Sequence, residues 1–178
     1  MTGPSDATPD GDNVVLVGLR ATGKTELGRR LAQRLGRPFL DTDALVEEIA
    51  GCSADALLAQ RGEAAFRAVE REALARAARA RGTVVATGGG AVLSGDAFAR
   101  LAATGVVVHL TAPVDELVRR ARARPQPALL PLPLAEEVAA LHAARTPLYR
   151  AVAQITVPVD RGDPILALLD RLSGFRIG

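Results

Sequence analysis

The sequence contains few of the residues that several classes of protein depend on. Its one cysteine, Cys52, cannot form a disulfide within the chain, which favours a reducing compartment and predicts a cytoplasmic protein. Tryptophan is absent and aromatic residues make up only 3%, so there is no evident platform for stacking nucleic-acid bases. The longest uncharged apolar stretch, between Arg100 and Asp115, is too short to span a bilayer. We therefore expect neither a nucleic-acid nor a membrane partner.

The bulk composition is that of a globular protein with one core. The chain has 178 residues, of which 48% are hydrophobic, and its formal net charge is only +2. This mild positive excess suits a small anionic ligand. Residues 1–12 are rich in Pro, Gly, Asp and Thr and predict a disordered tail. We find no internal repeat and no second domain, so we expect residues 13–178 to form a single domain. We also expect the protein to be a monomer.

The stretch from Gly18 to Thr25 fits the pattern G-x-x-x-x-G-K-[ST] of a phosphate-binding loop. An apolar run of strand type precedes it at residues 13–17, and apolar residues at helical spacing follow it. Glycines let successive backbone N–H groups point into one concavity, and the following helix adds the positive end of its dipole. Lys24 would reach the β- and γ-phosphates of a nucleotide, and the Thr25 hydroxyl would bind Mg²⁺.

Short β-branched runs alternate with helical patterns along the whole chain. We predict strands at residues 14–17, 38–40, 83–87, 106–110 and 155–159. We predict helices at residues 25–35, 43–81 (broken near Gly51 and Gly62), 95–102, 114–124, 135–144 and 164–172. This alternation indicates an α/β fold with a five-stranded parallel sheet flanked by helices. Ligands of such sheets bind beyond the carboxyl ends of the strands.

Polar or glycine-rich residues follow the first three predicted strands, so we expect them to converge. Asp41 and Asp43 follow the second strand, where an extended chain would point both carboxylates the same way. One could orient Mg²⁺ through water and the other could bind an acceptor hydroxyl, although either could instead cap the next helix. The run from Gly88 to Gly90 follows the third strand and predicts close approach of a ligand, with a tight turn as the alternative.

Two further features have less specific patterns. Arg67 and Arg145 could each hold a carboxylate through the guanidinium fork, although most of the arginines should be plain surface residues. Residues 125–133 contain four prolines, which exclude a regular helix, and several arginines precede them. This segment is either a cover over the site or an exposed connection.

Five motifs, in this order and spacing, resemble those of the shikimate kinase family. They are Gly18–Thr25, residues 38–43 (PFLDTD), residues 62–67 (GEAAFR), residues 86–90 (ATGGG) and residues 145–149 (RTPLY). The resemblance covers about residues 13–160. It implies a P-loop NTPase fold of the nucleoside-monophosphate-kinase-like type, with a lid at about residues 119–133. It also implies transfer of the γ-phosphate of ATP to the 3-hydroxyl of shikimate, with Mg²⁺.

The resemblance also implies roles for individual residues. Lys24, Asp43 and Arg120 would be catalytic. The nucleotide would be bound by Gly18, Ala21, Thr22, Gly23, Lys24, Thr25, Glu26, Arg120 and Arg124. Shikimate would be bound by Asp43, Arg67, Gly88, Gly89, Gly90 and Arg145. Thr25 would bind Mg²⁺, and Asp41 would support it through water.

Two departures from the family pattern leave alternatives open. The lid of the family usually reads Arg-Pro-Leu-Leu, whereas the comparable stretch here begins at Gln126 or, without a gap, at Pro127, so the expected arginine is absent and Arg124 could substitute for it. Glu26 follows Thr25 where the family commonly has Ser or Thr, and we expect it to point away from the phosphates. The alternatives are a catalytically weak binding or sensing domain on the same scaffold and a kinase of another small hydroxylated acid such as gluconate.

Overall fold

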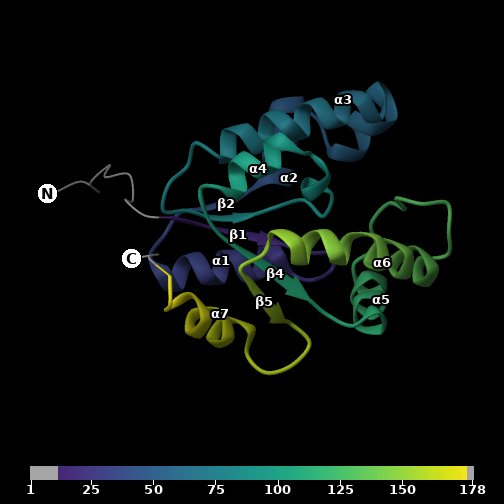
Figure 1. Cartoon of the computed structure of the whole chain (residues 1–178). Coiled ribbons are helices and arrows are strands. Elements are labelled where there is room, and N and C mark those ends of the chain that lie inside the picture. The colour runs from purple at the N-terminus through teal and green to yellow at the C-terminus, as the bar shows by residue number, and fades with distance from the viewer. Residues whose placement is uncertain (1–11, 176–178) are drawn as a thin grey trace, which may run out of the picture.

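The computed structural model describes residues 12–175, which form a five-stranded sheet in the order β2-β3-β1-β4-β5 (Figure 1). All four strand pairings are parallel. The strands are β1 (Asn13–Val17), β2 (Phe39–Asp41), β3 (Val84–Ala86), β4 (Gly105–Thr111) and β5 (Ile155–Pro158). This confirms the predicted fold class and all five strands. Of the predicted tail, only Asp12 falls within the described residues.

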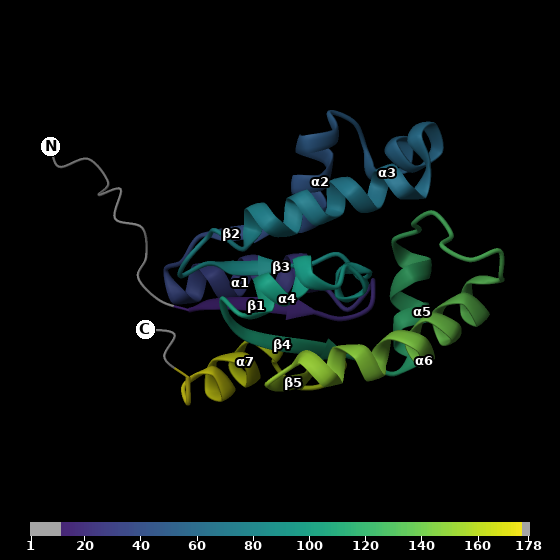
Figure 2. The ribbon, with the colours of Figure 1, turned by 45° about the horizontal axis from the view of Figure 1, so that its top comes forward.

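Helices cover both faces of this sheet. They are α1 (Lys24–Leu35), α2 (Thr42–Ala50), α3 (Ala54–Ala77), α4 (Asp96–Ala102), α5 (Val114–Ala123), α6 (Leu134–Val152) and α7 (Pro164–Leu172), with a short 3₁₀ helix η1 (Ala91–Leu93). Helices α1 and α7 pack against each other on one face, and α3 and α4 lie on the opposite face (Figure 1). Figure 2 shows α2 and α3 on one side of the carboxyl edge of the sheet, and α5 and α6 on the other.

The central strands are buried because helices cover both of their faces. Every residue of β1 and β3 is buried, as expected for strands that read as continuous apolar runs. Asn13 is the polar exception at the start of β1. Its amide group donates to the carbonyl of Ala80 and the hydroxyl of Thr104, and its side-chain oxygen accepts from the backbone N–H of Thr83. One side chain at the start of β1 therefore links the α3–β3 connection to the α4–β4 connection at the amino edge of the sheet.

One predicted helix was too short, whereas another is broken where the sequence predicted. The predicted helix at residues 135–144 continues as α6 to Val152, passing through Pro147. A proline inside a helix loses one backbone hydrogen bond, but burial of Thr146 and Tyr149 on the inner side of α6 offsets that cost. The predicted long helix at 43–81 divides at Gly51 into α2 and α3, and Gly62 interrupts α3 with φ of 77°. Both predicted breaks are therefore confirmed.

None of the helices within residues 12–175 is long and apolar enough to cross a membrane.

We expect Gly105→Ala to lower the free energy of unfolding by about 1–3 kcal/mol, because there is no room for a side chain. A β-carbon at Gly105 would lie 1.9 Å from the carbonyl oxygen of Asn13, where β1 and β4 pair. Gly174→Ala is the matched control, since a β-carbon there would meet nothing within 4 Å. Urea unfolding of both variants measures the difference. Equal stabilities would show that the β1–β4 contact is looser than described.

Candidate active site

The phosphate-binding loop joins β1 to α1 at the carboxyl edge of the sheet. Gly18, Ala21 and Gly23 all have positive φ, and Ala21 is the one residue other than glycine with positive φ in residues 12–175. A β-carbon on Gly18 would lie 2.4 Å from the carbonyl oxygen of Leu110 in β4, so only glycine fits there. Thr22 is buried, and its hydroxyl donates to the Leu19 carbonyl (2.7 Å). Its side chain therefore closes the loop from inside.

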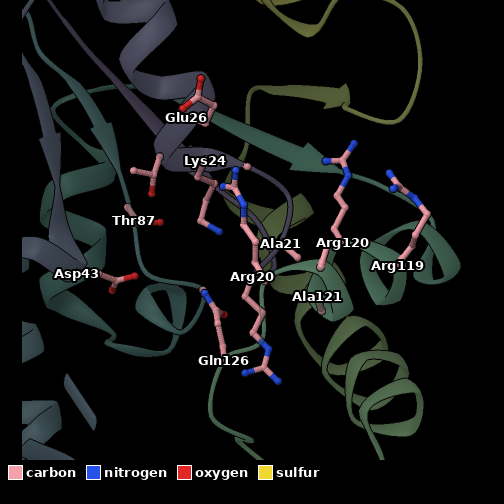
Figure 3. A pocket seen from close by; sticks show the side chains of 15 residues that line it. Arg20, Ala21, Lys24, Glu26, Asp43, Thr87, Arg119, Arg120, Ala121 and Gln126 are labelled. Carbon is pink, nitrogen blue, oxygen red and sulfur yellow. The ribbon is translucent and has the colours of Figure 1, made fainter. Parts of the chain in front are cut away.

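The ammonium of Lys24 lies inside this loop. Its Nζ donates to the carbonyl oxygens of Gly18 (2.8 Å) and Leu19 (2.9 Å), and the residue is buried. Burial lowers the pKa of Lys24 to about 8, although Asp43 and Asp41 oppose that shift. Figure 3 shows the ammonium directed into the space between Asp43 and the loop. A cation held this way can neutralise a bound polyanion.

Asp41 and Asp43 have different local structures, so the extended chain that would point both carboxylates the same way does not continue to Asp43. Strand β2 ends at Asp41, and α2 begins at Thr42. Asp41 caps α2 by accepting from the N–H of Asp43 (3.0 Å), and its other oxygen accepts from the Thr25 hydroxyl (2.7 Å). The capping alternative is therefore confirmed for Asp41, and Asp43 is free of that role.

Asp43 projects from the first turn of α2 toward the glycine run. A β-carbon on Gly88 would lie 2.4 Å from Oδ1 of Asp43, so the carboxylate fills the space that a side chain would need. The N–H of Gly88 donates to the hydroxyl of Thr42 (3.0 Å), which fixes the two segments together. Although Asp43 faces the open cavity, reduced solvation is the largest cause that raises its pKa to about 6. Asp41 raises it further, and Lys24 opposes the shift.

Both predicted arginines reach the same glycine run from opposite sides of the sheet edge. A β-carbon on Gly90 would lie 3.3 Å from Nη1 of Arg67, which comes from α3. A β-carbon on Gly89 would lie 3.6 Å from Nη1 of Arg145, which comes from α6. The structure therefore confirms that residues after β1, β2 and β3 converge, and it adds two guanidinium groups to them.

Two residues that hold these arginines and glycines were not predicted. Glu70 is buried and accepts from Arg67 (3.0 Å) and from the Ser94 hydroxyl (2.7 Å). The Tyr149 hydroxyl donates to the carbonyl of Gly89 (2.5 Å). Glu70 and Tyr149 stand three and four residues after Arg67 and Arg145, on the same face of their helices, so helical spacing could have revealed them.

A cavity of about 490 Å³ opens between the phosphate loop and α5 (Figure 3). Among the predicted site residues, those on its lining are Ala21, Gly23, Lys24, Thr25, Glu26, Asp43, Gly89, Arg120 and Arg124. Its other lining residues are Arg20, Thr87, Arg119, Ala121, Ala123 and Gln126. The remaining predicted residues (Gly18, Thr22, Asp41, Arg67, Gly88, Gly90 and Arg145) lie outside this lining. Glu26 is exposed, and its carboxylate points away from Lys24.

The arginines of α5 differ in how firmly they are held. Arg120 donates to Glu116 (2.6 Å) and to the carbonyl of Val159 (2.8 Å). Arg119 forms two hydrogen bonds of 2.7 Å with the same Glu116. Arg124 has no ion-pair partner in residues 12–175. The cavity therefore has three cationic side chains on its α5 side, of which Arg124 is the least constrained.

A phosphate loop after the central strand of a parallel sheet in this order, with helices on both faces, defines a P-loop kinase of the nucleoside-monophosphate-kinase-like class. A family model described as shikimate kinase matches residues 20–170. The shikimate kinase of Symbiobacterium thermophilum is 44% identical over 167 residues, which cover 90% of this chain and 95% of that protein. The chain belongs to the shikimate kinase family, and it is an ATP-dependent small-molecule kinase.

Solved structures agree with this assignment. The shikimate kinase of Acinetobacter baumannii in complex with shikimate has a TM-score of 0.86 and 34% identity, covering 96% of this chain and 98% of that one. A gluconokinase from Sinorhizobium meliloti has a TM-score of 0.52 and 19% identity, covering 92% of this chain and 94% of that one. That second likeness shows a shared fold alone.

We expect Asp43→Asn to raise the free energy of unfolding of the ligand-free protein at pH 8. The fold raises the pKa of Asp43 above its unfolded value, so the associated stability is present at low pH and is lost as pH rises through about 6. The gain at pH 8 should be on the order of 1 kcal/mol, because the open cavity screens the charge, and it should fade toward about pH 4. Urea unfolding at several pH values measures it, with Asp160→Asn in an exposed loop as control. A gain that is independent of pH would contradict the assigned cause.

Proposed function

We propose that this kinase transfers the γ-phosphate of ATP to the 3-hydroxyl of shikimate through the residues described above. The observation that carries the proposal is the convergence of Asp43, Arg67 and Arg145 on one glycine run beside Lys24. Two guanidinium groups and a carboxylate gathered beside a phosphate loop suit an acceptor that has one carboxylate and several hydroxyls. The family membership supports the same acceptor.

The phosphate loop would hold the donor. Its backbone N–H groups and the amino end of α1 favour negative charge, and Lys24 supplies a positive charge that is already inside the loop. Arg120 and Arg124 line the same cavity and would contact the phosphates from the α5 side. Phosphoryl transfer depends mainly on positioning and charge neutralisation, which these groups provide.

Thr25 and Asp41 would hold Mg²⁺, directly and through water respectively. The Thr25 hydroxyl, on the lining of the cavity, lies 2.7 Å from a carboxylate oxygen of Asp41, and Mg²⁺ prefers a few such oxygens completed by phosphates and waters. No group of three or more His, Cys, Asp or Glu side chains within residues 12–175 could hold a metal by itself, which fits a metal that arrives with the nucleotide. When bound, Mg²⁺ neutralises charge on the phosphates.

The acceptor side would bind shikimate against the glycines. Arg67 and Arg145 would hold its carboxylate, with Glu70 and Tyr149 fixing the positions of Arg67 and Gly89. Asp43 would accept a hydrogen bond from the 3-hydroxyl. As the oxygen forms its bond to phosphorus, its proton passes to Asp43, and ADP leaves with the electrons of the broken bond. A pKa near 6 keeps Asp43 ionised at neutral pH yet close enough to accept that proton.

We further propose that residues 13–178 act as a single domain, with residues 119–133 as its lid. We propose a cytoplasmic monomer that binds neither nucleic acid nor membranes. Support comes from the single sheet, the single cysteine, the low aromatic content and the dispersed arginines.

Shikimate-dependent release of ADP from MgATP tests the function directly. We expect the unaltered chain to turn over with shikimate and not with gluconate, and Asp43→Asn to lower kcat by about 10²–10⁴-fold because the proton acceptor is lost. Stabilisation by shikimate and ATP without turnover would instead favour a binding or sensing domain. Turnover with gluconate alone would favour the other kinase, and an unchanged kcat in Asp43→Asn would remove Asp43 from the chemistry.

Arg67→Met and Arg145→Met test how the acceptor is held. Each should raise the KM for shikimate by about 10- to 100-fold, because each removes a charged partner of the carboxylate, while the KM for ATP changes little. Arg150→Met, at an exposed position of the same helix as Arg145, is the matched control and should leave both constants unchanged. Equal effects on both substrates would show that these arginines do not define the acceptor site.

A further inference from the structure

Arg20 is the third residue of the phosphate loop, yet its guanidinium turns away from Lys24 (Figure 3). Its Nη2 donates to Oε1 of Glu137 at 2.6 Å, and its Nη1 donates to the carbonyl oxygen of Pro127 at 2.8 Å. Glu137 belongs to the first turn of α6, and Pro127 belongs to the proline-rich segment before it. One side chain of the loop therefore contacts two elements more than a hundred residues further along the chain.

Glu137 completes this contact from the other side. Its side chain is 1% exposed, and the same Oε1 accepts a second hydrogen bond from the backbone N–H of Leu129 at 2.7 Å. Pro127 and Leu129 flank Ala128, so the Arg20–Glu137 pair holds the chain on both sides of that residue. Gln126, which lines the cavity, directly precedes the held stretch.

The 124–133 segment has few other means of support. Residues 124–129 and 131–133 are exposed, and only Leu130 packs against the hydrophobic core. Prolines stiffen the segment but also remove backbone donors that could fix it. Its position over the nucleotide cavity therefore depends strongly on the Arg20–Glu137 pair.

The Arg20–Glu137 ion pair is not an efficient way to stabilise the fold. A buried ion pair loses solvation that its mutual attraction repays only with complete hydrogen bonding, and Nε of Arg20 is buried without a partner in the described part of the chain. Two apolar side chains of similar size could fill the same space at no greater cost. What apolar side chains cannot do is link the phosphate loop to a specific carbonyl and a specific N–H of the segment.

We propose that Arg20 and Glu137 are positioning residues that couple nucleotide binding in the phosphate loop to the position of the 124–133 segment. The inference rests on the proposed function, since it assigns the cavity to ATP. Phosphates bound by the loop fix Arg20, Arg20 fixes Glu137 and Pro127, and Glu137 fixes Leu129. Gln126 and Arg124 are thereby placed at the nucleotide. The side-chain hydrogen bonds that make this link do not include the glycine run of the acceptor side, although the backbone of Arg20 packs close to Gly89, where a β-carbon would lie 3.4 Å from the Arg20 nitrogen.

Methionine substitutions separate this coupling from stability. The test uses Arg20→Met, Glu137→Met and the double variant. The control set is Arg76→Met, Glu48→Met and their double variant, an exposed pair of 2.8 Å that joins α3 to α2 away from the cavity. For each protein we would measure the Tm, both KM values, kcat, and hydrogen exchange of residues 124–133 with and without ADP.

The single variants should lower the Tm, because each leaves a buried charge unpaired, and the double variant should recover most of that loss. The KM for ATP should rise roughly tenfold in all three variants, including the double, while the KM for shikimate changes less than about twofold. ADP should slow exchange in residues 124–133 of the unaltered protein, and that slowing should be lost in all three. The control set should show none of these changes.

Recovery of the KM for ATP together with the Tm in the double variant would overturn the proposal, because the pair would then serve stability alone. Equal slowing of exchange by ADP in the double variant would also overturn it. A failure of the proposed function would look different. The unaltered chain would then show no shikimate-dependent turnover, while the effect of ADP on exchange would still report whether the loop and the segment are coupled.

Discussion

The buried ammonium of Lys24 is the interaction on which the rest of the site depends. It is held by two carbonyl oxygens of its own loop, with Asp43 and Asp41 near enough to act on it through space. Carbonyl oxygens solvate the ammonium but do not neutralise its charge. The loop with its N–H groups therefore favours a polyphosphate even without the other cationic side chains. The same charge limits the rise in the pKa of Asp43, which keeps that carboxylate ionised near neutral pH. Donor and acceptor sides are thus electrostatically linked through one cation.

Close backbone approach is the second constraint, and it explains why glycine recurs where the parts meet. Gly18 fits beneath the carbonyl of Leu110, and Gly88 leaves space that the carboxylate of Asp43 fills. Gly89 and Gly90 allow two guanidinium groups from different helices to come near the same backbone. The parallel sheet brings these segments to one edge. Because glycine has no side chain, the segments can contact each other there. The absence of β-carbons in the glycine run is therefore what lets Asp43, Arg67 and Arg145 approach one stretch of backbone.

Much of this arrangement could be predicted because it depends on local patterns. The five strands, the phosphate loop and the convergence after the first three strands follow from short apolar runs and the rule for parallel sheets. The path of α6 through Pro147 could not, because burial of Thr146 and Tyr149 overrides the local preference of proline. The distinct roles of Asp41 and Asp43 depend on the residue at which β2 becomes α2, and element boundaries are poorly determined by sequence. Contacts such as Arg20 to Glu137 join residues 117 positions apart and leave no periodic signal.

The proline-rich segment brings these constraints together. This segment contains no arginine between Pro125 and Pro133, and the cationic side chains on the α5 side of the cavity are Arg119, Arg120 and Arg124, which precede Pro125. Arginines at the end of α5 can face the cavity without a contribution from side chains of the 124–133 segment, provided that this segment keeps its position. Residues 124–133 contain four prolines, so helix or sheet hydrogen bonds within the segment cannot fix its position. Contacts from other parts of the chain have to fix it. A buried carboxylate on α6 and an arginine of the phosphate loop provide that support, so the position of the 124–133 segment depends on the same loop whose sequence is that of a phosphate-binding loop.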